Sequence, residues 1–87
     1  MKVGDAVQII DQGMQMLMKF APPNTVPINQ GVILEVDGDE FMVVFPIGMD
    51  DPKKHSQVAP YNKYECLPLK SPHPQVLRLK EVMSSNA

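Results

Sequence analysis

Cys66 carries the most reactive side chain in this sequence and is its single cysteine. A catalytic thiol needs a base to activate it and a third group to orient that base. Cys66 stands between Glu65 and Leu67 in a short apolar segment, where a cysteine is usually a small core residue. One thiol cannot form an internal disulfide, and with His55 and His73 alone it cannot complete a four-ligand zinc site. These residues favour a structural cysteine in a reducing cytosol.

Acidic side chains form two further groups that could do chemistry. His55 follows Asp50 and Asp51, and imidazole with carboxylate suits several divalent ions. The loop is polar and the aspartates precede a proline, so a solvated loop is the favoured interpretation. The second group, at the tip of a predicted hairpin, is made of Glu35, Asp37, Asp39 and Glu40. A turn tip is wet and leaves carboxylates ordinary, so we predict neither acid–base chemistry nor a metal site.

A basic and aromatic patch is the feature that could contact nucleic acid. It consists of Lys53, Lys54, Tyr61, Lys63 and Tyr64. Single-strand binders combine lysines with stacking rings in this way. Phosphate binding usually requires a positive domain, however, and this chain has a formal charge of −2. Nucleic-acid binding is therefore the alternative, and a soluble surface is favoured.

Methionine is unusually frequent, with seven in 87 residues. Its flexible thioether adapts to irregular contours and is common where a surface fits a partner. Helical spacing gives two apolar stripes, Met14, Leu17, Met18 and Ala21 on one side and Met16 and Phe20 on another. For Met16 and Phe20, core and interface remain open alternatives. The predicted interface residues are Met14, Met16, Met18, Phe20 and Met42.

The elements that position these residues are short, because nine prolines and five glycines divide the chain. Apolar and polar residues alternate over 3–10, which predicts a strand. Good helix formers occupy 14–21 and end at Pro22, which predicts a two-turn helix. We expect an irregular connection over 24–29.

The clearest local signal is a hairpin whose turn is 37–40. An Asp-Gly pair between two β-rich segments, 30–36 and 41–46, reverses an antiparallel pair. Both arms are more continuously apolar than a sheet with one wet face requires. We therefore expect the helix at 14–21 or a second subunit to cover the outer face.

The remainder of the chain predicts two more strands, which makes five in all. A loop at 47–55 leads to a strand at 56–61, a tight turn at 62–65 and an edge strand at 66–69. The tail at 75–83 fits a strand or a helix, with a slight preference for helix.

Size and composition indicate one globular domain over 1–83 with a frayed end at 84–87. There is no apolar run of about 18 residues and no secretory leader, so we expect a cytoplasmic protein away from membranes. A domain this short has little core to stabilise it, and neither disulfides nor zinc are available. Self-association is the remaining source of stability.

The order of elements resembles the SH3-like small barrels, including KOW and Tudor-type modules. The residues that carry the resemblance are Val3-Gly4-Asp5 with Val7, the run from Gly31 to Gly38, Phe41 to Phe45, and the turn before Cys66-Leu67. The resemblance implies a mainly β, five-stranded SH3-like barrel, here with a short helix inserted after the first strand and a C-terminal extension. Fold alone fixes no activity. The chain also resembles small products of mobile elements such as integron cassettes, although no motif carries this resemblance.

One SH3-like enzyme can be compared with this sequence residue by residue. It is the type II dihydrofolate reductase, whose tetrameric pore carries a Val-Gln-Ile-Tyr segment. Gln57 and Tyr61 stand in a comparable place but farther apart. We expect no enzyme and no cofactor. The sequence predicts a protein-binding or self-associating module, a homo-oligomer formed through the methionine-rich helix and the hairpin face.

Overall fold

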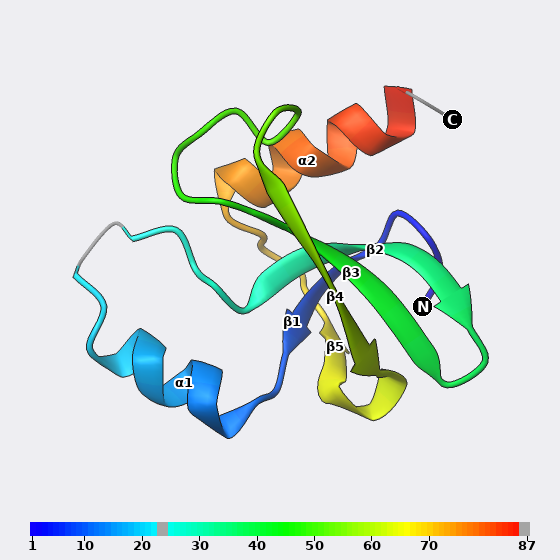
Figure 1. The fold of residues 1–87 in the computed structure, drawn as a ribbon, viewed down its shortest axis with the longest axis horizontal. Helices are drawn as coiled ribbons and strands as arrows, with labels where there is room; N and C mark the ends of the chain where they lie inside the picture. The colour runs from blue at the N-terminus through cyan, green and yellow to red at the C-terminus, as the bar shows by residue number, and fades with distance from the viewer. Residues whose placement is uncertain (23–24, 86–87) are drawn as a thin grey trace.

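The computed structural model describes residues 1–22 and 25–85, which form one antiparallel sheet and two helices (Figure 1). The strands are β1 Ala6–Ile9, β2 Gln30–Asp37, β3 Glu40–Pro46, β4 Ser56–Asn62 and β5 Cys66–Pro68. The helices are α1 Gln12–Lys19 and α2 Pro74–Ser85, with a 3-10 turn, η1, at Lys63–Glu65. The prediction of a mainly β chain with five strands is confirmed.

The strands follow the order β4-β3-β2-β1-β5. β4 and β5 therefore lie at opposite edges, and the described sheet is open. The closed SH3-like barrel expected from the sequence is thus not confirmed. The short β5 bears Pro68, and its pairing is limited to Val7, Gln8 and Ile9 of β1.

The predicted hairpin is confirmed as β2 and β3, with Gly38 at φ +60° in the turn. One feature was not foreseen. The pairing passes from Ile33 with Val43 to Glu35 with Met42, so Leu34 is an extra residue in a β-bulge.

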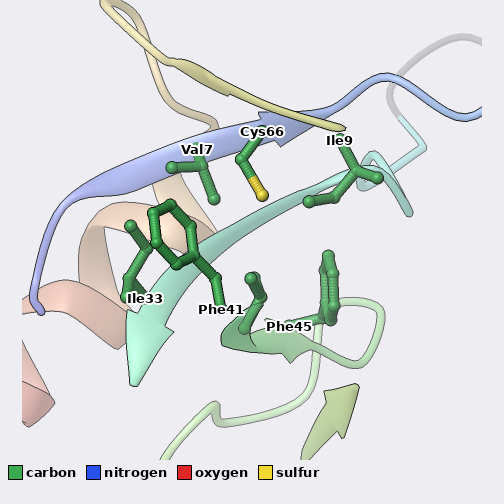
Figure 2. Close-up of a cluster of buried hydrophobic side chains, with 7 residues drawn as sticks. Val7, Ile9, Ile33, Phe41, Phe45 and Cys66 are labelled. Atoms are coloured by element: carbon green, nitrogen blue, oxygen red, sulfur yellow. The ribbon is translucent and has the colours of Figure 1, made fainter. Parts of the chain in front are cut away.

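Both faces of the sheet are covered over the part of the hairpin away from its turn, whereas Leu34 and Val36 near the turn are exposed. One face carries a cluster formed by Val7, Ile9, Ile33, Phe41, Val43, Phe45 and Cys66. Figure 2 shows its side chains converging from β1, β2, β3 and β5. The opposite face carries Ala6, Val32, Val44, Val76 and Leu79. Val76 and Leu79 belong to α2, so α2 rather than the helix at 14–21 covers this face.

The C-terminal segment is a helix, in agreement with the slight preference for helix over strand at 75–83. His73 closes its first turn, because its Nδ1 accepts the Gln75 N–H at 3.1 Å and its carbonyl accepts the Val76 N–H at 2.9 Å. His73 is half-buried at the start of α2. The backbone of α2 extends to Ser85, and 86–87 lie outside the described residues.

Helix α1 begins two residues earlier than the predicted 14–21. Asp11 is its N-cap, and Asp11 Oδ1 accepts the Met14 N–H at 3.1 Å. The helix ends at Lys19 with Phe20 as C-cap, before Pro22. Residues 23–24 of the predicted stop and connection lie outside the described residues. Neither described helix is long and apolar enough to cross a bilayer.

Candidate functional site

The exposed side of α1 is an uninterrupted apolar stripe. Gly13, Met16, Leu17 and Phe20 follow the i, i+3, i+4, i+7 spacing of one helix face. Met16 is 63% exposed, Leu17 64% and Phe20 84%. We name Met16, Leu17 and Phe20 the α1 ridge. Within a single chain, none of the residues of α1 is buried.

The inner side of α1 holds the helix on the sheet. Met14 packs against the cluster of Figure 2, and its sulfur lies 4.0 Å from the Tyr61 hydroxyl. Met18 is half-buried on the same side. Gln12, Gln15 and Lys19 form the polar flank. The sequence assigned Leu17 to the stripe of Met14 and Met18, but Leu17 is exposed beside Met16.

The predicted interface is divided by the sheet. Met42 lies between Phe41 and Val43 on β3, and both of these belong to the cluster that Met14 contacts. Successive side chains of a strand point to opposite faces. Met42 is therefore on the α2 face, away from Met14, Met16, Met18 and Phe20.

An apolar cleft of about 300 Å³ lies between Met14 of α1 and the strands β3 and β4. It is lined by Met14, Ile28, Phe45, Pro46, Ile47, Gly48, Gln57, Ala59 and Tyr61. The rings of Phe45 and Tyr61 meet edge to face, with centroids 5.9 Å apart and planes at 76°. Gln57 and Tyr61 share this wall because they are four residues apart on β4.

Tyr61 is the one ionisable side chain among the residues that line the cleft. Burial raises the pKa of its hydroxyl, and the charges of Asp11, Glu65 and Cys66 raise it further. The hydroxyl is therefore protonated at neutral pH. The cleft offers an apolar concave surface and two polar side chains, Gln57 and Tyr61. Its described lining holds no general base.

The basic and aromatic residues do not form one surface. Lys53 and Lys54 precede β4, whereas Lys63 and Tyr64 follow it. The seven residues of β4 extend over about 20 Å. The two pairs consequently lie at opposite ends of the strand, and Tyr61 lines the cleft between them.

The side chain of Lys63 interacts with two other residues of the same chain. Its ammonium lies 2.9 Å from Asp39 Oδ1 and 5.1 Å from the centre of the Tyr64 ring. The hydrogen bond and charge of Asp39 raise the pKa of Lys63. The interaction links η1 to the acidic hairpin tip, where Glu35, Asp37 and Glu40 are also exposed.

The remaining chemical candidates have structural surroundings. Cys66 is buried, its sulfur is 3.7 Å from the Asn62 carbonyl, and burial followed by the charge of Glu65 raises the pKa of its thiol. A raised pKa reduces the thiolate fraction that a nucleophile requires. Over residues 1–22 and 25–85, no three His, Cys, Asp or Glu side chains gather around a metal position, and His55 is exposed with Asp50 and Asp51.

Both edges of the sheet offer few backbone donors to an added strand. In β4 the outward positions alternate as Val58, Pro60 and Asn62. Pro60 has no N–H, and the Asn62 N–H donates to Glu65 Oε1 at 3.1 Å. At the other edge the Cys66 N–H donates to the Lys63 carbonyl, and Pro68 has no N–H. A partner strand would find few free donors at either edge.

The α1 ridge is the feature that sequence reasoning described least accurately. The signal that locates it is Asp11, because an N-cap there starts the helix at Gln12 and brings Gly13 into the exposed stripe. No protein-family model, curated protein or solved structure matches this chain.

Proposed function

We propose that this chain is a non-catalytic binding module that associates with itself through the α1 ridge. The observation that carries the proposal is the exposure of Met16, Leu17 and Phe20 side by side on one short helix. Isolated exposed apolar residues are ordinary, but a contiguous apolar patch typically marks an interaction surface.

The energetics of α1 support this function. An eight-residue helix is too short to be stable in water by its own hydrogen bonds. Its tertiary support in one chain comes from Met14 and half-buried Met18. Covering Met16, Leu17 and Phe20 would remove large apolar side chains from water. Full burial of such a side chain stabilises a structure by about 1.5–3 kcal/mol.

The alternatives have less support. The basic residues are separated by the length of β4, and Lys63 is paired with Asp39. The cleft unites Gln57 and Tyr61, as the likeness to a small reductase requires, but its described lining contains no base. The scarcity of free donors at the sheet edges favours docking by side chains over docking by backbone pairing.

The test compares two leucines on helices at opposite faces of the sheet. Leu17→Asp places a charge in the α1 ridge, while Leu77→Asp places it on the exposed side of α2, where Leu77 is 45% exposed. We expect the parent chain and Leu77→Asp to associate in sedimentation velocity and light scattering. Leu17→Asp should be monomeric because a charge is costly to bury in an apolar contact. Met16→Asp should behave like Leu17→Asp.

The controls concern folding. Circular dichroism and urea unfolding should give both aspartate variants a folded core, because neither leucine is buried. A parent chain that stays monomeric over the whole accessible concentration range would overturn the proposal. So would equal association by Leu17→Asp and the parent.

A further inference from the structure

The ridge has a shape that is complementary to itself. The side chains on this face of α1 increase in size along the helix. Gly13, which precedes the ridge, has no side chain, Met16 and Leu17 follow, and Phe20 ends the face with a large ring. The seven steps from Gly13 to Phe20 span about 10 Å of helix. A twofold axis between Met16 and Leu17 therefore brings Phe20 of one copy over Gly13 of the other, and Leu17 over Met16.

We infer that the partner on the α1 ridge is the α1 ridge of a second copy, packed antiparallel about a twofold axis with Phe20 inserted at Gly13. This inference rests on the proposed function and specifies its partner and geometry. Because the interface uses the same patch on both chains, the assembly closes as a dimer.

The exposed area of the chain fits one such partner. A compact monomer of 9.7 kDa is expected to expose about 5,100 Å². This chain exposes 5716 Å², an excess of about 600 Å² that approaches the roughly 800 Å² each partner buries in a standard interface. Its radius of gyration is 12.2 Å, against about 12 Å for a compact domain of this length. The chain is thus as compact as expected for its length and exposes more surface than its mass predicts.

Charge and chemistry are compatible with this pairing. Lys19 is the one charged side chain within α1, and it lies on the polar flank. Antiparallel packing offsets the two Lys19 residues by about 7.5 Å along the pair, whereas a parallel pair would place them level, and it opposes the two helix dipoles. Met16 near the axis can adjust to its symmetry mate, because its side chain is unbranched and flexible.

The orientation is tested with thiols on the polar flank. Gln12→Cys and Lys19→Cys are prepared separately, mixed after subunit exchange, and treated with a short bifunctional maleimide. In the antiparallel pair, positions 12 and 19 of opposite chains differ by about 3 Å along the axis, whereas two copies of position 12 differ by about 14 Å. We expect the mixture to cross-link several-fold more than Gln12→Cys alone. The same experiment in Cys66→Ala shows that the native thiol takes no part.

A second measurement tests the contact of Phe20 with Gly13. Phe20→Ala should weaken the dimer at least about tenfold, as expected of a buried aromatic anchor. Tyr64→Ala is the matched control, since Tyr64 is 76% exposed on η1, and it should leave the dimer unchanged.

Each contrary result has a distinct meaning. Strong cross-linking of Gln12→Cys alone indicates parallel helices and overturns the inference. Association that is lost in Leu17→Asp without any cross-link at position 12 or 19 also overturns it, because the ridge then docks elsewhere, for example in the cleft of the next copy. In both cases the proposed function stands. A monomeric parent chain overturns the inference and the proposed function together.

Discussion

Gly31 is a position at which the neighbouring strand leaves no room for a side chain. It lies on β2 opposite Val7, and a Cβ placed there would lie 2.5 Å from the Val44 carbonyl oxygen and 2.7 Å from Val43 Cγ1. The carbonyl belongs to the backbone of β3 and cannot move aside without disturbing the pairing. Glycine is required here by the close approach of two strands, rather than by a turn.

Gly31→Ala should therefore destabilise the chain by about 2 kcal/mol, the usual cost of overpacking a core. Urea unfolding followed by circular dichroism measures this loss. A Gly31→Ala chain as stable as the parent would contradict the backbone clash.

Cys66 gives the core a dependence on pH. Burial raises the pKa of its thiol. Above the pKa of a free thiol, about 8.5, the unfolded chain releases a proton that the folded chain retains. The free energy of unfolding should therefore fall as the pH rises from about 8 toward 10.

Urea unfolding at a series of pH values, for the parent and Cys66→Ala, measures this dependence. Cys66→Ala should be less stable at neutral pH because it leaves a cavity. Its stability should nevertheless decline less between about pH 8 and 10. Equal slopes would show that the thiol does not titrate with unfolding. The raised pKa of Tyr61 adds a similar decline above about pH 10.

At the scale of elements, α1 and α2 are stabilised differently. α2 buries Val76 and Leu79 against the sheet, and buried Gln75 donates to the carbonyls of Asp50 and Gly48 at 2.7 and 3.2 Å. α1 has Met14 on the core cluster and Asp11 as its N-cap. The helix that carries the proposed interface is thus the one with less support from its own chain.

Asp11→Ala should unravel α1 without unfolding the core, because it removes the cap, worth about 1 kcal/mol, from a helix that has little other support. Hydrogen exchange should rise over 12–19 and self-association should weaken. Asp11→Asn retains a capping oxygen and should preserve both. If Asp11→Ala associates as the parent does, the ordered helix is not needed for docking.

Considered as a whole, the molecule combines sheet edges that have few free donors with one open helix face. Prolines 60 and 68 and the bonded N–H groups of Asn62 and Cys66 limit growth by strand pairing. The sheet is covered by α2 on one face, while the α1 side retains the ridge and the cleft. A domain of 87 residues with this distribution can gain stability by pairing and has little route to uncontrolled growth.

Local patterns in the sequence were sufficient to predict the strands, the hairpin and the turn at Asn62–Glu65, where η1 forms with a capping box. These features depend on alternation, the Asp-Gly turn and prolines, which act over a few residues. The sequence also supported a helix in each of the two segments that became α1 and α2, although the start of α1 was placed two residues late.

Tertiary structure alone decided which faces are covered and whether the sheet closes. Both arms of the hairpin looked over-apolar, yet only packing could show that α2 supplies the cover and that Met42 faces away from Met14. Proximity across the sheet depends on contacts between residues distant in the chain, which no local pattern records. For the same reason Lys53 and Lys63 seemed to form one patch, until the length of β4 separated them.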